Sequence, residues 1–581
     1  MRTKNKLILI VAGVIALSGM LALDIAYRGL FWQFAWSVTG EEEPVGQLRA
    51  VPQWITTQLR SQPDTDPLVP INYAGENPYG INTFLQLEVE APKIETMLQM
   101  ISDAGFTWLR QEFPWEDIEV DGRGQFTDSR WDYDGDGIPD AIDSWAKYDQ
   151  IIDLTEEYGL RLQVRLDKAP AWAFEEEAEG SYPPPDDMQD FVNFAVAVAE
   201  RYKGRIQHYQ IWNEPNIYPE WGNQAVNPEA YTDMLCRTYT ALKAVDPDIV
   251  VISAALGPTI ALTERDLNDL IYLQRMYDAG VADCFDVLSA QGYGLFSGPT
   301  DQRMRPTTVN VGHHIYVRDI MVANGDAHKP IWISEAAWNS VPTPEEEPNI
   351  TGIREQYGQV TQEQAADYIA EYYQRAQEEW PWIGVINYWF FTRPDPFESD
   401  QPMYYFRMVE PDYQPDTHPT FTPLPVYTAM QEQIAYHFPT LYQGAHQADN
   451  HWAIDSGEAQ IVMVDDAQFG RAVETTYMAF TSDATDVIVR WKGEGFTIKF
   501  CDASTSTYTS EHDGWNITTI HHSQRAQIKS INILADTPIL IDSITILDRT
   551  NKNLFPYYVG IFISLFMLIL AIWDGLRERH K

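Results

Sequence analysis

Short apolar runs alternate with amphipathic stretches from about residue 78 to residue 437. The short runs have the length of strands, and the longer stretches repeat apolar residues with helical spacing. This pattern predicts eight strand–helix pairs, the repeat of an α/β (β/α)8 TIM barrel. We expect strands near residues 80–87, 106–111, 161–166, 207–212, 249–254, 285–290, 331–334 and 384–390. We expect helices over residues 92–104, 145–158, 187–202, 228–244, 266–279, 309–324, 361–379 and 424–436.

The pattern changes after the predicted barrel domain, residues 78–437. Residues 438–550 contain Thr-, Ile- and Val-rich stretches such as TDVIVRW and SINILAD, which alternate polar and apolar positions without helical periodicity. This favours a β-rich accessory domain resembling a β-sandwich. Two roles stay open for it: binding carbohydrate, or acting as a packing and spacer domain.

Both ends of the chain contain an apolar segment. Residues 7–23 follow the basic start MRTKNK, and no small-x-small cleavage site comes after them. An uncleaved anchor is therefore favoured for residues 1–36, with a cleaved signal peptide as the alternative. Residues 554–573 are long enough to span a bilayer and precede a basic tail, residues 574–581.

Positive charge flanks both apolar segments on their outer-terminal sides, which places both termini in the cytoplasm by the positive-inside rule. The protein is then expected at the cell membrane, with its catalytic domain extracytoplasmic. Residues 40–70 are acidic and rich in proline. We therefore predict an extracellular stalk over residues 37–77.

Charge and cysteine content narrow the possible functions. The net charge of the 581-residue chain is −44, which makes nucleic acid and anionic surfaces poor partners. The three cysteines are too few for a disulfide scaffold or a zinc–thiolate cluster. Cys236 and Cys284 either form a disulfide outside the cell or remain buried free thiols.

Two glutamates follow predicted strands four and seven. IWNEPN, residues 211–216, supplies Glu214, and PIWISEAAW, residues 330–338, supplies Glu335. Catalytic groups of a TIM barrel lie at the carboxyl ends of its strands. Two carboxyl groups there suit cleavage of a glycosidic bond, in which one donates a proton and the other stays ionised beside the sugar carbon.

These motifs, with GFTWLRQEFPW at the second strand, resemble clan A glycoside hydrolases, closest to families 5 and 39, which include cellulases, mannanases and xylosidases. The resemblance covers residues 78–437 and implies that Glu214 is the general acid/base and Glu335 the nucleophile of a retaining mechanism. It also implies that Arg110 holds the Glu335 carboxylate ionised and that Tyr293 hydrogen-bonds it. By the same resemblance Asn213 donates to the substrate 2-hydroxyl, and Trp389 is the platform under the sugar. Near the same strand ends, either subsite lining or core packing is expected of Trp172, Trp221 and Trp338.

One position departs from the resemblance. The sixth strand of these families often ends in His-x-Tyr, whereas this chain has Gln291, Gly292 and Tyr293. Glutamine can donate a hydrogen bond but cannot titrate. Any charge role of that histidine is therefore absent here.

An acidic loop, DYDGDGIPDAID at residues 132–143, lies between the second strand and its helix. It resembles the calcium loops of thrombospondin type 3 repeats and dockerins, with Gly137 at the turn position. We expect it to hold structural Ca²⁺, with an acidic turn as the alternative. The expected ligands are Asp132, Asp134, Asp136, Asp140 and Asp143.

Together these features predict a retaining glycoside hydrolase that cleaves β-linked oligo- or polysaccharides without an organic cofactor. Two alternatives keep the same barrel. One is a carbohydrate-binding or sensing protein without turnover, and the other is a transglycosylase that builds surface glycans. A purely structural envelope protein has no need for the two glutamates.

Overall fold

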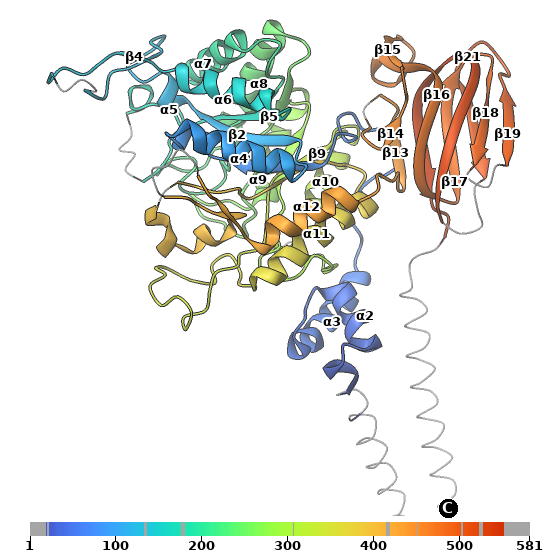
Figure 1. Cartoon of the computed structure of the whole chain (residues 1–581), viewed down its shortest axis with the longest axis horizontal. Helices are drawn as coiled ribbons and strands as arrows, with labels where there is room; N and C mark the ends of the chain where they lie inside the picture. The colour runs from blue at the N-terminus through green and yellow to red at the C-terminus, as the bar shows by residue number, and fades with distance from the viewer. Residues whose placement is uncertain are drawn as a thin grey trace, which may run out of the picture.

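A closed ring of eight parallel strands forms the larger part of the molecule in this computed structural model (Figure 1). The strands are β1 (Tyr79–Thr83), β2 (Trp108–Pro114), β5 (Arg161–Asp167), β6 (His208–Ile211), β7 (Val250–Ile252), β8 (Leu288–Gln291), β9 (Ile331–Ala336) and β10 (Ile383–Tyr388). The structure describes residues 19, 23–132, 136–175, 180–305, 307–394, 396–413, 419–449, 451–500, 504–521 and 527–550.

The order of the strands around the ring follows their order in the chain. Hydrogen-bonded pairing runs β7-β6-β5-β2-β1-β10-β9-β8. Two isolated parallel bridges, Ile252 with Val287 and Leu256 with Ala290, close the ring between β7 and β8. The predicted (β/α)8 barrel is therefore confirmed.

Eight helices alternate with these strands, as the sequence predicted. Capping residues mark several helix starts; at Thr361 the side chain accepts from the Gln364 backbone while the Gln364 side chain accepts from the Thr361 backbone. The helices are α4 (Ala91–Asp103), α6 (Ala146–Glu157), α7 (Met188–Arg201), α8 (Pro228–Val245), α9 (Asp269–Asp278), α10 (His314–Ala323), α11 (Gln362–Glu379) and α12 (Pro425–Tyr436).

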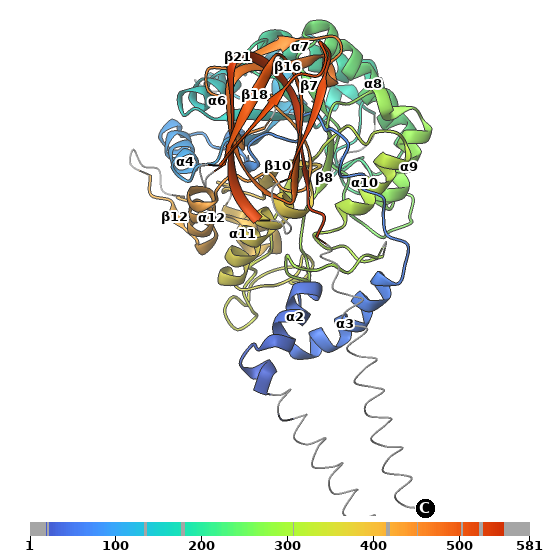
Figure 2. The same cartoon turned by 90° about the vertical axis from the view of Figure 1, so that its right-hand side faces the viewer.

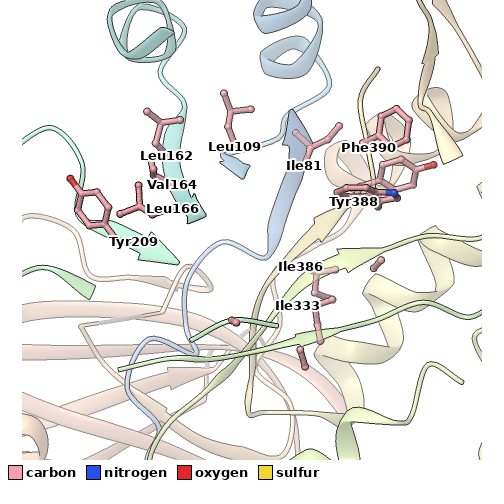
Figure 3. Close-up of a cluster of buried hydrophobic side chains, with 14 of the residues drawn as sticks. Ile81, Leu109, Leu162, Val164, Leu166, Tyr209, Ile333, Ile386, Tyr388 and Phe390 are labelled. Atoms are coloured by element: carbon pink, nitrogen blue, oxygen red, sulfur yellow. The ribbon is translucent and has the colours of Figure 1, made fainter. Parts of the chain in front are cut away.

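The apolar core lies between the strands and this layer of helices. Alternate strand residues such as Leu162, Val164 and Leu166 of β5 belong to it, together with residues of the neighbouring strands (Figure 3). Because successive side chains of a strand point to opposite faces, the residues between them point into the barrel. In β5 those inward residues are Gln163 and Arg165.

The barrel interior has two contrasting layers. Near the strand starts, Trp108, His208 and Trp332 pack ring against ring at centroid distances of 4.8 to 5.5 Å. One step further along the strands the inward residues are polar and bond across the barrel. Asn387 Nδ2 donates to Gln163 Oε1 at 3.1 Å, and Gln210 donates to Ser334.

The accessory domain is an antiparallel sheet with its own apolar core, as predicted. Its longest strand is β21 (Gln527–Leu547). It pairs with β16 (Arg471–Ala484) over residues 527–541 and with β18 (Gly495–Phe500) over residues 531–534, and then with β17 (Asp486–Lys492) over residues 540–547 and with β13 (Gly444–Gln447) over residues 543–546. The remaining strands are β14 (Ile454–Asp455), β15 (Gln460–Met463), β19 (Thr505–Thr509) and β20 (Asn516–His521).

This domain contacts the barrel at the strand starts. Trp452 N–H donates to the Gly75 carbonyl at 2.7 Å, and Arg471 donates to Asn72 at 2.6 Å. Residues 72–75 precede β1, so the sheet covers the end of the barrel opposite the expected catalytic residues (Figure 2). That position supports a packing role more than a role in binding substrate at the catalytic end.

The segment predicted as an anchor followed by a stalk is folded in part. α2 (Leu30–Thr39) crosses the proposed boundary at residue 37, and α3 (Pro44–Gln58) occupies the first half of the expected stalk. Trp36 packs against Tyr368 of α11 at 5.5 Å. Residues 30–58 therefore form a helical pair that packs on the barrel, in the region predicted as the end of the anchor and the start of the stalk. Pro44 begins α3 at a position where proline suits a helix.

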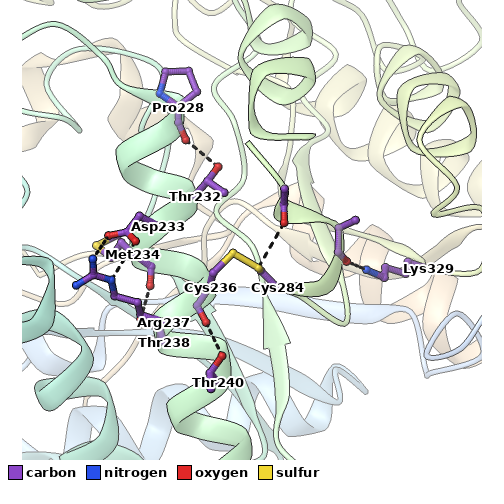
Figure 4. Close-up of a disulfide and its surroundings, with 12 residues drawn as sticks. Pro228, Thr232, Asp233, Met234, Cys236, Arg237, Thr238, Thr240, Cys284 and Lys329 are labelled. Atoms are coloured by element: carbon purple, nitrogen blue, oxygen red, sulfur yellow. Dashed lines mark hydrogen bonds and ion pairs between the residues drawn. A yellow bond between two sulfur atoms is a disulfide. The ribbon is translucent and has the colours of Figure 1, made fainter. Parts of the chain in front are cut away.

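A disulfide joins Cys236 of α8 to Cys284 near the start of β8 (Figure 4). Of the two alternatives left by the sequence, the structure has the bonded pair. It closes a loop of 48 residues around β7 and α9.

No helix among the described residues is both long and apolar enough to cross a membrane. The two predicted spans, residues 7–23 and 554–573, lie outside the described residues except for Gly19 and Leu23.

Candidate active site

Glu214 lies just beyond the carboxyl end of β6. Its backbone φ is +36° and that of Trp212 is +69°, so the chain turns sharply as it leaves the strand. Such left-handed backbone is costly for residues with side chains and is concentrated at functional sites. The Glu214 N–H donates to the Ala255 carbonyl at 3.0 Å, which fixes the turn against the end of β7.

Glu335 lies at the carboxyl end of β9, where the pairing register with β8 shifts. Both carboxylate oxygens accept hydrogen bonds. Arg110 Nη1 donates to Oε1 at 3.0 Å, and the Tyr293 hydroxyl donates to Oε2 at 2.6 Å. The side chain is only 5% exposed, so its orientation is fixed by these two donors.

Arg110 is the centre of a buried polar layer under the nucleophile candidate. Besides Glu335, its guanidinium donates to Gln210 at 2.7 Å, to Asn82 at 2.7 Å and to Asn213 at 3.2 Å. A guanidinium can be buried at tolerable cost when its donors are matched by a carboxylate and amide oxygens. The predicted link between Arg110 and Glu335 is present.

Gln291, the last residue of β8, and Tyr293, two residues later, reach one glutamate each. Gln291 Nε2 donates to Glu214 Oε1 at 2.7 Å, while Tyr293 holds Glu335. The position that departs from the family pattern therefore contacts the candidate acid directly. It does so as a neutral donor.

The environment pushes Glu214 towards its protonated form. Burial and the negative charge of Glu335 raise the pKa of Glu214 to about 8, although the Gln291 hydrogen bond acts in the opposite direction. The two glutamates are neighbours, because Gln291 bonds Glu214 and pairs with Glu335 across β8 and β9. A protonated Glu214 beside an Arg110-paired Glu335 is the arrangement that general acid catalysis of glycoside cleavage needs.

Asn213 connects the two glutamates' surroundings to a second charged cluster that the sequence did not reveal. It hydrogen-bonds Glu220 as well as Arg110. Beyond Glu220 the cluster continues through Arg165, whose side chain lies 2.6 Å from Glu112 and 2.8 Å from Asp167. The alternation of Gln163, Arg165 and Asp167 along β5 was the available signal.

The predicted tryptophans divide into two groups. Trp338 and Trp221 are 1% exposed, and the Trp338 ring fills the space beside Gly294, so both pack in the core. Of the two roles left open for Trp338, this burial favours core packing. Trp172 is partly exposed and donates to the Glu119 carbonyl at 2.8 Å. Trp389 follows β10 and is 8% exposed, so its role as a sugar platform stays a prediction.

The acidic loop bends as its glycine predicted. Gly137 has φ of +85°, and its N–H donates to Asp132 Oδ2 at 2.7 Å. Asp136, Asp140 and Asp143 are described, but Asp134 lies outside the described residues. Within the described part of the chain, no group of three or more metal-binding side chains is close enough to hold an ion.

Residues 70–265 match the family model described as Cellulase (glycosyl hydrolase family 5). The matched region contains Arg110, Asn213 and Glu214, whereas Tyr293 and Glu335 lie beyond it. This match bears out the resemblance to clan A glycoside hydrolases over residues 70–265. No curated protein matches the chain.

Several solved structures are similar in fold. A family 39 glycoside hydrolase from the gut symbiont Bacteroides cellulosilyticus WH2 is 18% identical, with 81% of this chain and 82% of that chain covered and a TM-score of 0.45. A family 39 β-xylosidase from Caulobacter crescentus is 14% identical, with 82% and 99% covered and a TM-score of 0.41. An exo-β-1,4-mannosidase from Opitutaceae bacterium strain TAV5 is 15% identical, with 64% and 62% covered and a TM-score of 0.41.

Proposed function

We propose that this glycoside hydrolase cleaves β-linked oligo- or polysaccharides with retention of anomeric configuration. The observation that supports the proposal most directly is the opposite treatment of two neighbouring carboxyl groups. Glu335 is paired with Arg110 and accepts from Tyr293, while burial and Glu335 raise the pKa of Glu214 to about 8.

In the proposed first step, Glu335 attacks the anomeric carbon and Glu214 gives its proton to the glycosidic oxygen as that bond breaks. The products are a glycosyl ester on Glu335 and the released alcohol. In the second step Glu214, now ionised, removes a proton from water, which attacks the same carbon and frees Glu335. In this proposal Asn213, whose side-chain oxygen accepts from Arg110, donates to the sugar 2-hydroxyl as positive charge develops.

The test is the configuration of the first product. A form covering residues 23–550 keeps both α2 and the accessory domain and can be assayed on aryl β-glycosides and β-glucans. Proton NMR should detect the β-anomer of the released sugar before mutarotation. An initial α-anomer would contradict the retaining mechanism.

The same assay separates the alternatives. Gln291, in place of the family's histidine, is the observation that leaves room for a binding or sensing protein. Saturable sugar binding without turnover would support that function. Sugar transfer to an added acceptor at the expense of hydrolysis would instead identify a transglycosylase.

We further propose that the loop at residues 132–143 holds structural Ca²⁺, because its hard oxygen donors and its bend at Gly137 suit that ion. Removal of calcium by a chelator should then lower the melting temperature. An extracytoplasmic location at the cell membrane also remains our proposal, and the disulfide between Cys236 and Cys284 supports an oxidising compartment.

A further inference from the structure

Helix α3 turns an apolar stripe towards solvent. Its large aliphatic side chains Val45, Leu48, Ile55 and Leu59 (the last at its C-cap) are 59, 56, 38 and 73% exposed. With the exposed Pro52 they are spaced by three, four, three and four residues, so they share one face of the helix. A helix that packs on a globular core normally has the reverse arrangement.

The opposite face of α3 is buried and partly polar. Gln47, Ala50, Trp54 and Thr57 are all at most 6% exposed. Gln47 Nε2 donates to the Trp32 carbonyl at 3.2 Å and to the Glu41 carbonyl at 2.9 Å. The helix is thus oriented by specific hydrogen bonds, and the outward stripe follows from that orientation.

The helical pair is also fixed to the barrel by ionic contacts. Arg303, in the loop after β8, donates to the Thr39 carbonyl at 3.1 Å and to Glu41 at 2.9 Å, and Asp301 holds the same guanidinium at 2.8 Å. Arg303 is 9% exposed. A segment fixed in this way presents its apolar stripe in a defined direction.

Three more exposed apolar side chains lie just before α2 and at the first residue of α2. Leu23, Tyr27 and Leu30 are 59, 83 and 83% exposed. Figures 1 and 2 show α2 and α3 together at the lower edge of the molecule, away from the sheet of the accessory domain. We call the seven side chains of residues 23–59 the N-terminal apolar surface: Leu23, Tyr27, Leu30, Val45, Leu48, Ile55 and Leu59.

Charge along α3 suits phospholipid headgroups. Residues 44–60 contain Arg49 and Arg60, both exposed, and no acidic residue. Residues 44–60 are therefore locally positive, whereas Glu41, Glu42 and Glu43 lie immediately before them at the N-terminal end of α3. An apolar helical face bordered by arginines is the pattern of helices that lie in the membrane interface.

We infer that the N-terminal apolar surface docks on a lipid bilayer. α3 lies along the membrane plane, with its stripe at the boundary between headgroups and acyl chains and with Arg49 and Arg60 at the phosphates. The apolar segment of the predicted anchor, residues 7–23, ends where this surface begins, which favours lipid over a second copy of the chain or a soluble protein. The inference does not depend on the proposed catalytic reaction.

A fluorescence experiment on the full chain tests this placement. Leu48→Cys and Leu59→Cys, each in a Cys501→Ser background, are labelled with an NBD fluorophore. Met463→Cys is the matched control, since Met463 is 80% exposed in β15 of the accessory domain. The proteins are reconstituted with phosphatidylcholine–phosphatidylglycerol vesicles, with and without lipids that carry a doxyl quencher on the acyl chain.

The expected result is a blue shift and strong quenching at positions 48 and 59, with neither at position 463. If the protein floats with the vesicles but the fluorophore at position 48 or 59 shows no more blue shift or quenching than the one at position 463, the inference is overturned. Absence of the protein from the vesicles would also overturn it. A blue shift that depends on protein concentration without lipid would assign the surface to a second copy instead.

A double variant gives an independent readout. In the form covering residues 23–550, Leu48→Glu/Leu59→Glu should lower the fraction of protein that floats with vesicles several-fold relative to Met463→Glu. Equal melting temperatures for the two variants would show that the fold is intact. Unchanged binding by the double variant would overturn the inference.

Discussion

The two ends of the barrel are built from the same strands and have opposite character. Along β2 the inward residues are Trp108, Arg110 and Glu112, so one strand passes from an indole through a guanidinium to a carboxylate. At the closed end Trp108 packs on Trp332 and His208 beneath the accessory domain. At the open end the buried charges of Arg110 and Glu335 face each other. The apolar end stabilises the barrel, and the polar end positions reacting groups.

Burial favours the neutral form of ionisable groups at both ends, but the consequences differ. Burial, and then the charge of Arg161, lower the pKa of His208 to about 3, so the ring is neutral and packs as an aromatic. Burial and Glu335 raise the pKa of Glu214 to about 8. Glu214 is only partly buried and so can still exchange its proton with a substrate or water.

The largest expected effect is at the open end. Glu335→Gln removes the proposed nucleophile while keeping the shape of the side chain, so kcat on an activated aryl glycoside should fall on the order of 10⁴-fold. Trp332→Phe, on the same strand at the closed end, is the control and should leave kcat within a few-fold. Comparable losses in the two variants would refute the division between the ends.

Arg110→Met should affect both activity and stability. It leaves the buried Glu335 without its cation, and breaking a buried ion pair costs about 3–5 kcal/mol. Urea unfolding should show that loss, and kcat per folded molecule should fall as well. Retention of full activity would contradict the role of Arg110 in holding the nucleophile.

Trp332→Ala should affect stability alone. Removing a fully buried indole from the closed end should lower the free energy of unfolding by about 3–5 kcal/mol. Below the unfolding transition, kcat and KM should match those of the unchanged protein. A changed KM would show that the closed end influences the substrate site.

The smallest expected effect is a shift in the pH profile. Because Glu214 must be protonated to act as acid, kcat/KM should fall as the pH rises through about 8. The Gln291 hydrogen bond lowers that pKa, so Gln291→Leu should move the alkaline limb to higher pH. Rate measurements from pH 5 to 10 would check this, and a limb that moves downward would contradict the assigned contact.

The raised pKa of Glu214 also makes the stability of the folded state depend on pH. The folded state holds a proton that the unfolded state releases above its ordinary carboxyl pKa, so this group makes folding less favourable as pH rises from about 4.5 to about 8. Glu214→Gln removes that dependence. Its melting temperature should therefore exceed that of the unchanged protein more at pH 8 than at pH 5.

The sequence predicted the barrel well because its signals are local. All eight strands and eight helices lie where periodicity placed them, and the motif residues Arg110, Asn213, Tyr293 and Glu335 form one hydrogen-bonded group. Contacts across the barrel, such as those of Gln210, join residues more than a hundred positions apart and leave no local pattern. The choice between subsite lining and core packing for Trp338 was left open for the same reason.

The helical pair at residues 30–58 was missed because its pattern is inverted. Acidic residues and prolines at residues 40–70 indicated a solvated spacer, but α3 is oriented by Gln47 and by the Arg303 contacts with α2. A polar residue that anchors a helix cannot be distinguished by sequence from one that faces water. The helical spacing of the apolar stripe on α3 was the sequence signal that could have predicted this helix.

One loop joins the chemistry to the N-terminal helices. Tyr293 donates to Glu335, and ten residues later Arg303 holds the backbone end of α2. If α3 rests on a surface, this short connection would fix the distance and orientation of the catalytic opening relative to that surface. The enzyme would then reach only glycans at a limited distance from the surface, so position as well as sugar type would determine which glycans it cleaves.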